Sequence, residues 1–470
     1  MYLGRRITED GRGRSRYLRY FSILILLFFS LSFISLASSY TNATVSEAKT
    51  LIDSKHSLVV LDVRTQSEYD SGHIRNAKLI PHTELEGRLD ELNKTDGILV
   101  YCRTGGRSST ASQILVDNGF LYVYNMLGGI TAWIDEGYPV YVKYSSIQEA
   151  INNASEGETI FVSSGLYYEH LTVNKSLALV GENKDTTIID GTTTGTVVHV
   201  KAENISISSF TIRKSGCACS GYSGVYVESY HQNVNVTNNL IMQNGYGIKL
   251  DWAHNIIIAR NNIINNDDGV HILNYSSNNS IVGNILTNNG VGIEFHKSSN
   301  NTLSGNNIKN NDFYGVWLDS SSYNKLYHNN FIDNTQQVYS YASTNVWDYG
   351  YPSGGNYWSD YTGADLYSGP NQNVTGSDGI GDTPYVTDEN NTDNLPLMSP
   401  FEYWSNPISG DINKDMKVNW KDLLMLARAY GAEKGELSYL LGADLNDDDE
   451  IDWKDLLILA MNYGKEWEQT

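Results

Sequence analysis

The sequence predicts a multidomain protein with three kinds of fold: an α/β domain, a right-handed parallel β-helix and a small α-helical domain with cation-binding loops. Three observations lead to this prediction. Short apolar runs alternate with amphipathic stretches in residues 44–142, a repeat of 22 or 23 residues runs through residues 146–340, and two acidic segments recur 33 residues apart in residues 409–470. A chain of 470 residues also exceeds what one hydrophobic core ordinarily supports, so separate domains are expected.

Residues 1–39 have the pattern of an export signal. Six arginines precede an apolar run from Phe21 to Ala37, and small residues follow it. The run is short for a membrane span, and the alternative to cleavage is an uncleaved N-terminal anchor. We therefore expect a secreted, extracellular or cell-surface protein. The net charge of −21 leaves no basic surface to bind phosphates, so a nucleic-acid partner is not expected.

The region 44–142 alternates between two patterns. Leu58–Leu61 and Ile98–Tyr101 are short apolar runs that are expected as strands, whereas residues 85–92 and 109–118 are amphipathic and expected as helices. Such alternation is typical of a parallel α/β sheet.

Cys102 lies where the second of these strands ends and begins a glycine-rich loop. The loop continues with Arg103, Thr104, Gly105, Gly106, Arg107 and Ser108. A turn of this kind at a helix N-terminus directs several backbone N–H groups at one point, and the helix dipole and arginines lower the pKa of a thiol there. A buried, inert cysteine is the alternative, but it gives the arginines and glycines no role. We therefore expect a thiolate site that suits thiosulfate or the terminal sulfur of a persulfide.

The motifs of this region resemble those of a single-domain rhodanese. They are Leu61–Arg64, Glu68–Tyr69, Ser71–Ile74, Ala77, Ile80–Pro81, Tyr101–Ser108 and Leu127–Trp133. The resemblance implies that Cys102 takes up sulfane sulfur as a persulfide and passes it to a thiol or cyanide, without an organic cofactor. Four residues separate Cys102 from Arg107, one fewer than in phosphatases of the same fold, which indicates a ring that handles sulfur. The implied catalytic residues are Cys102, Arg107, Arg103, Asp62 and Arg64, the last two bracing the site, and the implied substrate contacts are Thr104, Gly105, Gly106 and Ser108.

Residues 146–340 repeat at a period that predicts a stacked coil. Gly224, Gly247, Gly269, Gly292 and Gly315 are spaced by 23, 22, 23 and 23 residues, and the first and third residues after each are apolar. Strict alternation places those apolar side chains inside. Asn239, Asn262, Asn284, Asn307 and Asn330 keep the same period and are expected to form an internal ladder of amides. A helix over 147–152 and a strand over 159–162 are expected to begin the solenoid.

The solenoid resembles carbohydrate-binding and NosD-type β-helices, a likeness at the level of the fold. Two outward columns follow from the alternation: Tyr226, Lys249, His271, Glu294 and Trp317, and Glu228, Asp251, Leu273, His296 and Asp319. Such a face suits a polysaccharide, with Asp251 and Glu294 as candidate acids of a hydrolase or lyase, whereas a plain solvated face is the alternative. Cys217 and Cys219 are either a thiol pair for a soft metal such as Cu(I) or part of an ordinary turn. Residues 341–404 are expected as a loop-rich cap, in which Asp378 and Asp382 are candidate ligands of a cation.

Residues 409–470 contain two acidic loops that repeat the same positions. Oxygen-bearing side chains fall at loop positions 1, 3, 5, 9 and 12, namely Asp411, Asn413, Asp415, Asn419 and Asp422, then Asp444, Asn446, Asp448, Asp452 and Asp455. With the backbone carbonyls of Lys417 and Glu450 at position 7, each loop supplies the oxygens that Ca²⁺ prefers, so two calcium sites are predicted. A solvated acidic tail would not repeat these positions. Asp at position 12 and a single helix after each loop resemble a type I dockerin, which implies docking to a cohesin partner through Trp420, Lys421, Trp453 and Lys454.

Together these features favour an exported sulfurtransferase whose other modules place it on a surface, with a glycan and a cohesin as partners. One alternative is a non-catalytic adhesion or assembly protein. The other is a β-helix polysaccharide lyase or hydrolase. The cysteine loop is complete, whereas the solenoid shows no acid–base motif, so the sulfurtransferase ranks first.

Overall fold

The computed structural model describes residues 39–54, 58–228, 230–402 and 451–463, together with Val418, Leu423, Leu426, Ala427, Tyr430 and Gly431. The chain divides into two compact units, Met1–Val140 and Tyr141–Thr470. The export signal was predicted over residues 1–39, of which residues 1–38 lie outside the described residues. Within the described part, no helix combines the length and the apolarity that a membrane crossing requires.

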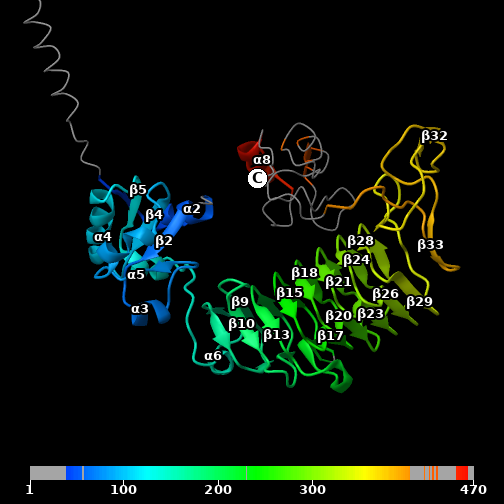
Figure 1. Cartoon of the computed structure of the whole chain (residues 1–470), viewed down its shortest axis with the longest axis horizontal. Coiled ribbons are helices and arrows are strands. Elements are labelled where there is room, and N and C mark those ends of the chain that lie inside the picture. The colour runs from blue at the N-terminus through cyan, green and yellow to red at the C-terminus, as the bar shows by residue number, and fades with distance from the viewer. Residues whose placement is uncertain are drawn as a thin grey trace, which may run out of the picture. The chain divides into compact units, whose positions relative to one another are not determined.

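The first unit is a five-stranded parallel sheet with helices on both faces (Figure 1). The strand order is β1 (Thr41–Ala43), β5 (Tyr122–Met126), β4 (Gly97–Tyr101), β2 (Leu58–Asp62) and β3 (Lys78–Leu79). The helices are α2 (Val45–Ser54), α3 (Gln66–Asp70), the 3₁₀ segment η1 (Leu85–Glu91), α4 (Gly106–Asp117) and α5 (Gly129–Asp135). One buried cluster contains Leu115 of α4, and the other contains Ala48 of α2 and Trp133 of α5. Both faces of the sheet are therefore covered, as is usual for parallel sheets.

The predicted elements of this unit form with one correction. Strands β2 and β4 and helix α4 confirm the predicted strands and the second predicted helix. The helix predicted over 85–92 is instead a 3₁₀ segment, interrupted at Arg88, where φ is −130° and ψ is 21°. Leu85 is the buried side chain of this segment. A helix gains most of its stability from packing an apolar face, and one buried side chain gives little to hold a regular α-helix.

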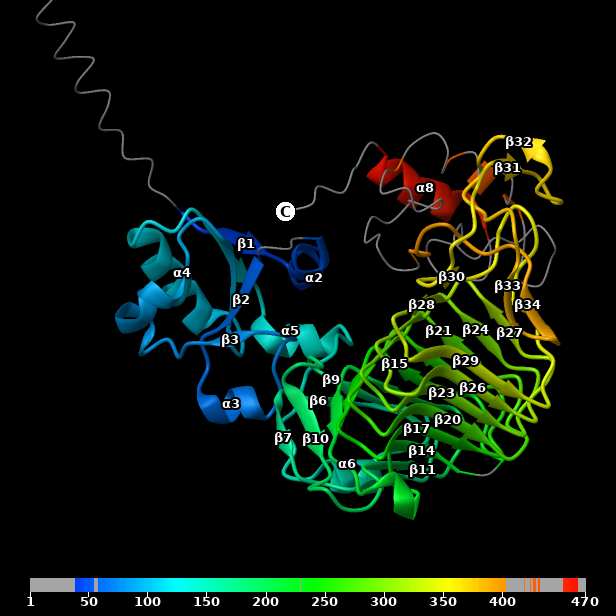
Figure 2. The ribbon, with the colours of Figure 1, turned by 45° about the vertical axis from the view of Figure 1, so that its right-hand side comes forward.

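The second unit begins with α6 (Ile147–Asn153) and continues as a coil whose turns contribute strands to three parallel sheets (Figures 1 and 2). Sheet I contains β6 (Glu158–Val162), β9 (Leu177–Gly181), β12 (Ile205–Ser208), β15 (Val234–Thr237), β18 (Ile257–Ala259), β21 (Ser280–Val282), β24 (Thr302–Ser304) and β27 (Lys325–Tyr327). Sheet II contains β7 (Gly165–Tyr167), β10 (Thr187–Asp190), β13 (Thr211–Arg213), β16 (Leu240–Met242), β19 (Asn262–Ile264), β22 (Ile285–Thr287), β25 (Asn307–Lys309), β28 (Asn330–Ile332) and β30 (Tyr357–Trp358). Sheet III contains β8 (Leu171–Val173), β11 (Val198–Val200), β14 (Ser223–Val227), β17 (Tyr246–Asp251), β20 (Asp268–Leu273), β23 (Val291–His296), β26 (Tyr314–Asp319) and β29 (Gln336–Tyr341). The predicted parallel β-helix is thereby confirmed.

The glycine column explains how sheet III stacks. A Cβ on Gly247 would lie 2.4 Å from the carbonyl oxygen of Gly269, and a Cβ on Gly292 would lie 2.4 Å from that of Gly315. Only glycine allows successive coils to approach this closely. The apolar residues predicted to lie inside are fully buried: Val225, Val227, Ile248, Leu250, Val270, Ile272, Ile293, Phe295, Val316 and Leu318.

An internal asparagine ladder is present, but the predicted register is partly wrong. Asn239 and Asn284 belong to it, whereas Asn262, Asn307 and Asn330 begin strands of sheet II one position further along the chain. The true members are Asn239, Asn261, Asn284, Asn306, Asn329 and Asn356, and each Nδ2 donates to the next Oδ1 at 2.9–3.1 Å. Adjacent asparagines occur at 261–262, 306–307 and 329–330, so both members of each pair keep the period, and spacing alone does not choose between them.

The segment after β29 closes the solenoid with loops and two short hairpins, β31 (Tyr367–Ser368) with β32 (Val374–Thr375), and β33 (Tyr385–Asp388) with β34 (Asn391–Asp393). The carboxylate of Asp382 accepts the backbone N–H groups of Leu366 and Tyr367, and that of Asp378 accepts the N–H of Gly369. These two carboxylates therefore accept hydrogen bonds from the backbone of the loop in this structure. Beyond the solenoid, α8 (Trp453–Asn462) lies in the C-terminal region.

Candidate functional site

Cys102 follows β4 directly, at the carboxyl edge of the first sheet. Leu99, Val100 and Tyr101 of β4 are fully buried, which fixes the position of the strand end. Gly105 has φ of 102°, in the left-handed region that favours glycine, and it turns the chain into α4. The N–H of Gly105 then donates to Cys102 Sγ at 3.1 Å, and the cysteine is 1% exposed. The loop therefore directs this amide at a nearly buried sulfur.

Two opposing effects act on the pKa of the Cys102 thiol. Burial raises the pKa, but hydrogen bonds from the Ser108 side chain and backbone, and from the N–H groups of Gly105 and Thr104, outweigh it and lower the pKa below its ordinary value. The Ser108 hydroxyl also has Asn125 Oδ1 at 2.7 Å and the Gly105 carbonyl at 3.1 Å as acceptors, so its single proton is shared among three acceptors. The backbone amides are consequently the steadier donors, and they favour the thiolate.

The two arginines of the loop differ in their surroundings. Arg107 donates to both carboxylate oxygens of Glu68, at 2.8 and 2.5 Å, and the hydrogen bond from Arg107 lowers the pKa of Glu68 to about 2. Glu68 also accepts the N–H of Thr65 at the start of α3, which fixes its position. Arg103 is exposed at the mouth of the loop. Glu68 was not among the predicted site residues, although it lies in one of the motifs that carry the resemblance.

Asp62 and Arg64 form a buried ion pair beside the cysteine loop. Arg64 Nη2 lies 2.7 Å from Asp62 Oδ2 and donates to the backbone carbonyl of Gly72 at 2.7 Å. Asp62 ends β2 and pairs in register with Tyr101, the residue before Cys102. The pair therefore lies at the strand end next to the thiol, and its bracing role stays a prediction from the resemblance.

The start of α5 holds the cysteine loop from its other side. The N–H of Ile130 donates to the carbonyl of Cys102 at 2.8 Å, and the N–H of Thr131 donates to that of Arg103 at 3.1 Å. A Cβ on Gly129 would lie 2.3 Å from the Cys102 carbonyl oxygen, so this approach requires glycine. Gly129, the first residue of α5, is thus a structural part of the site.

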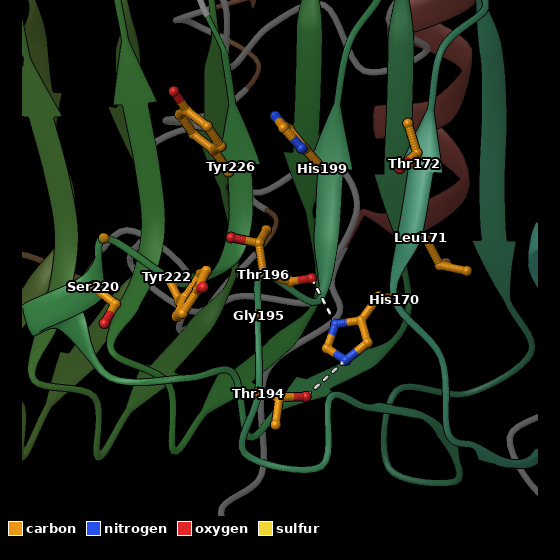
Figure 3. Close-up of a pocket in the computed structure, with 11 residues that line it drawn as sticks. His170, Leu171, Thr172, Thr194, Gly195, Thr196, His199, Ser220, Tyr222 and Tyr226 are labelled. Atoms are coloured by element: carbon orange, nitrogen blue, oxygen red, sulfur yellow. Dashed lines mark hydrogen bonds between the residues drawn. The ribbon is translucent and has the colours of Figure 1, made fainter.

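The solenoid carries a groove of about 610 Å³ at the end of sheet III nearest β8 (Figure 3). Its lining includes His170, Thr196, His199, Tyr222 and Tyr226. The His170 ring makes hydrogen bonds with the Thr196 carbonyl at 2.8 Å and the Thr194 hydroxyl at 3.2 Å, which fixes the ring. His199 stacks on Tyr226 with ring centroids 4.8 Å apart. Flat rings therefore lie beside hydroxyl groups in this groove.

The register of sheet III confirms the predicted outward column that begins at Tyr226 and ends at Trp317. It also confirms the second column from Asp251 to Asp319. Asp251 accepts from the Tyr226 hydroxyl at 3.3 Å and from Asn274 Nδ2 at 2.9 Å. Glu294 lies instead in the other column, with its Oε2 3.1 Å from His271 Nδ1. The two predicted acids therefore have separate sets of neighbours.

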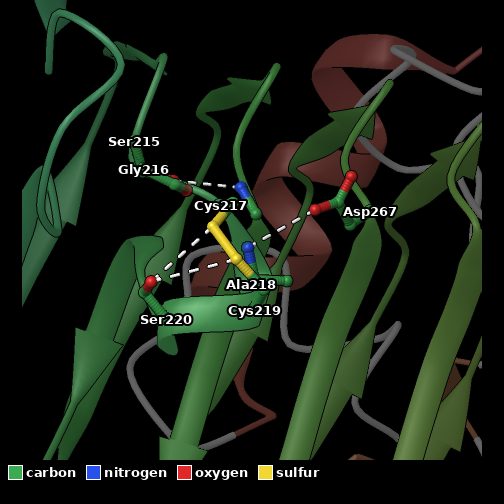
Figure 4. Close-up of a disulfide and its surroundings, with 8 residues drawn as sticks. Ser215, Gly216, Cys217, Ala218, Cys219, Ser220 and Asp267 are labelled. Carbon is green, nitrogen blue, oxygen red and sulfur yellow. Dashed lines mark hydrogen bonds between the residues drawn. A yellow bond between two sulfur atoms is a disulfide. The ribbon is translucent and has the colours of Figure 1, made fainter.

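Cys217 and Cys219 form a disulfide on the surface of the solenoid (Figure 4). Cys217 precedes the short 3₁₀ segment η2 (Ala218–Ser220), Cys219 lies within it, and the Ala218 N–H points at Asp267 Oδ2 at 3.4 Å. An oxidised pair offers no thiolate, so the predicted soft-metal alternative does not fit this structure. The disulfide closes the turn that borders the groove at Ser220 and Tyr222.

Of the predicted calcium ligands, Asp452 and Asp455 are described, and the other ten lie outside the described residues. Asp452 Oδ1 accepts the N–H of Lys454 at 2.7 Å, and Asp455 Oδ2 accepts the N–H of Asp452 at 2.8 Å, which together cap α8. Asp455 is fully buried. A carboxylate at this position offers an oxygen of the kind that Ca²⁺ binds. Among the predicted partner-binding residues, Lys454 lies 3.4 Å from Asp452 Oδ2, the Trp453 side chain is not described, and Trp420 and Lys421 lie outside the described residues.

Family models match three stretches of the chain. A rhodanese-like domain matches residues 44–136, a periplasmic copper-binding protein (NosD) matches residues 151–363, and a dockerin type I domain matches residues 409–462. The three predicted resemblances are thereby confirmed.

Individual relatives match the first of these stretches. Thiosulfate sulfurtransferase 18 of Arabidopsis thaliana is 38% identical over 125 residues, which cover 24% of this chain and 90% of the relative. A sulfurtransferase of Allochromatium vinosum is 36% identical over 95 residues, which cover 20% of this chain and 88% of the relative. The crystal structure of a rhodanese-related protein from Thermoplasma volcanium shares 34% identity at a TM-score of 0.21, over 22% of this chain and all of that one.

Proposed function

The chain belongs to the rhodanese-like family of sulfurtransferases, and from that premise we propose that Cys102 carries the transferred sulfur as a persulfide. We further propose that the protein is exported, that its β-helix binds carbohydrate, and that its dockerin attaches it to a cohesin-bearing partner in the presence of calcium. The proposed modules are residues 44–142, 146–340 with the cap 341–404, and 409–470.

The observation that carries the sulfur-transfer proposal is the near-buried Cys102 sulfur that accepts the Gly105 N–H at 3.1 Å. In the first step, the thiolate attacks the outer sulfur of thiosulfate, the sulfur–sulfur bond breaks, and sulfite leaves with the bonding electron pair. In the second step, cyanide or an acceptor thiolate attacks the outer sulfur of the persulfide and regenerates the Cys102 thiolate. Inward-facing amides stabilise the negative charge on the persulfide sulfur between the steps. Neither step requires an external oxidant or reductant, and neither needs a cofactor.

Replacement of the sulfur atom tests this proposal. The purified full chain should release thiocyanate from thiosulfate and cyanide, and Cys102→Ser should abolish that release, because a hydroxyl does not form the persulfide. The double variant Cys217→Ser/Cys219→Ser is the matched control and should keep the wild-type rate. Equal rates for Cys102→Ser and the wild type would remove the enzymatic proposal.

The groove on sheet III supports the carbohydrate-binding proposal, because rings of His199 and Tyr226 lie beside threonine hydroxyls. A glycan array should show binding to the full chain, and Tyr226→Ala should weaken it. Tyr323→Ala, which removes an exposed tyrosine elsewhere on the solenoid, is the control. No binding to any glycan would leave the solenoid as a spacer.

The dockerin match and the buried Asp455 support calcium-dependent attachment. Calcium would be held by the acidic loops, and in that role it orders the loops rather than takes part in sulfur transfer. The copper in the description of the NosD family is not part of this proposal, because Cys217 and Cys219 of the solenoid form a disulfide. Export and surface location are proposed from the N-terminal pattern and from the dockerin and NosD matches.

A further inference from the structure

Three metal-ligating side chains converge on the outer face of sheet III. Asp268 and His271 project from β20, and Glu294 projects from β23 on the next coil. His271 Nδ1 lies 3.1 Å from Glu294 Oε2 and 3.5 Å from Asp268 Oδ2, and one ligand atom of each residue lies within 4.8 Å of the other two. We name these residues the outer triad.

The coil itself brings the triad together. Gly269 and the inward-facing Val270 separate Asp268 from His271 along β20, and the parallel register places His271 directly beside Glu294. The side chains are largely covered, with exposed fractions of 13% for His271, 18% for Asp268 and 13% for Glu294. Two carboxylates are therefore held close together with restricted access to water, which is costly unless a cation compensates their charge.

The hydrogen-bond geometry distinguishes the triad from an ordinary ion pair. Nδ1 of His271 is buried and, among the described residues, makes no aligned hydrogen bond, although two carboxylate oxygens lie within 3.5 Å. On the same face of the sheet, Nδ1 of His296 makes a regular hydrogen bond to Asp319 Oδ2 at 3.0 Å. Nδ1 of His271 is thus a close neighbour of both carboxylates without an aligned hydrogen bond to either.

The lysine that neighbours His271 in the sheet register is engaged by aromatic rings. Lys249, the neighbour of His271 in the outward column, lies over the rings of Tyr226 and Tyr246, at 4.9 and 5.7 Å from their centroids. On the other side, Trp317 follows Glu294 in the same column, and its buried Nε1 has no hydrogen-bond partner among the described residues.

We propose that the outer triad binds a divalent cation of the first transition-metal row, namely Zn²⁺ or Mn²⁺. One imidazole nitrogen and two carboxylate oxygens suit such an ion, whereas Ca²⁺ prefers oxygen ligands alone and soft Cu(I) prefers sulfur. The separations of 3.1 and 3.5 Å are those of ligand atoms that share one ion, given bonds of about 2.0–2.2 Å. Three protein ligands leave coordination positions open to water or to an oxygen of a bound glycan.

Calorimetric titration with Zn²⁺ tests the proposal on the full chain. The chain carries Cys102→Ser, which removes the reactive thiolate, and excess Ca²⁺ occupies the acidic loops. We expect zinc to bind, and His271→Asn and Glu294→Gln each to weaken the affinity at least about tenfold. His296→Asn is the matched control, because it alters the regular histidine–aspartate pair on the same face, and it should leave the affinity unchanged.

A spectroscopic measurement keeps the test independent of variant stability. X-ray absorption of the zinc-loaded chain should show only nitrogen and oxygen neighbours, including one imidazole. The proposal is overturned if zinc does not bind, if both triad variants bind as tightly as the parent chain, if the control loses affinity equally, or if the shell contains no imidazole. In those cases the three side chains form an imidazolium held between two carboxylates. None of these outcomes bears on sulfur transfer by Cys102.

Discussion

At Cys102, a strand end, a left-handed glycine and a helix start bring several donors to one sulfur atom. The sequence predicts a lowered thiol pKa, with the helix dipole and both arginines as its expected cause. The direction agrees with the structure, but the physical cause differs: Ser108 and the loop amides oppose burial, and Arg107 is engaged by Glu68. Glu68 lies 39 residues before Arg107, and a contact across that distance depends on tertiary folding rather than on a local pattern.

A substitution at Ser108 tests this balance. Ser108→Ala removes one donor to the sulfur, so the pKa of Cys102 should rise, and thiolate should appear only at higher pH than in the wild type. The pH dependence of Cys102 alkylation by iodoacetamide measures this. Thr110→Ala, on the exposed face of α4, is the control. An unchanged alkylation profile in Ser108→Ala would mean that the backbone amides alone hold the thiolate.

At the scale of elements, periodicity predicted the solenoid well because each coil repeats the same steric demand. The glycine column, the inward apolar pairs and both outward columns all keep a period of 22 or 23 residues. The predicted asparagine ladder was wrong at three positions, because either member of a tandem asparagine pair fits the period. Part of the outer triad could be predicted from the sequence, because the predicted outward column placed His271 beside Glu294. Asp268 lies outside that column.

The corrected ladder predicts which asparagines hold the coils together. Asn284 accepts from Asn261 Nδ2 and donates to Asn306 Oδ1 and to the Ile258 carbonyl. Asn284→Ala leaves several buried groups without partners and should destabilise the neighbouring coils by about 3 kcal/mol or more. Hydrogen exchange of β18 and β21 measures the loss.

The control for this prediction is Asn262→Ala, one position outside the ladder and partly exposed. It should change the free energy of local opening by less than about 1 kcal/mol. If Asn262→Ala accelerated exchange as strongly as Asn284→Ala, the corrected register would be contradicted.

At the scale of the whole molecule, the chain joins a sulfurtransferase domain, a β-helix and a dockerin, and the family matches confirm all three. These modules could be recognised from sequence because each depends on short-range spacing: a cysteine loop, a coil period and a repeated set of oxygen ligands. The disulfide between Cys217 and Cys219 is different, because two nearby cysteines give no local indication of whether they are reduced or joined.

The modular account predicts that calcium acts on one part of the chain. Chelation should greatly increase hydrogen exchange in residues 409–470, because binding free energy of the ion is part of that domain's stability. The solenoid strands and the thiocyanate-forming rate should remain unchanged. Protection of residues 409–470 that survives chelation would contradict the calcium assignment, and parallel loss across the solenoid would contradict its confinement to the dockerin.

Sulfur uptake is measured most directly by the mass of the Cys102 peptide after the intact protein is incubated with thiosulfate and no acceptor. The predicted result is a gain of one sulfur atom on the peptide that contains Cys102, lost again when cyanide is added and absent from Cys102→Ser. A Cys102 peptide of unchanged mass, in protein that retains its fold, would contradict the central claim that this cysteine carries sulfur.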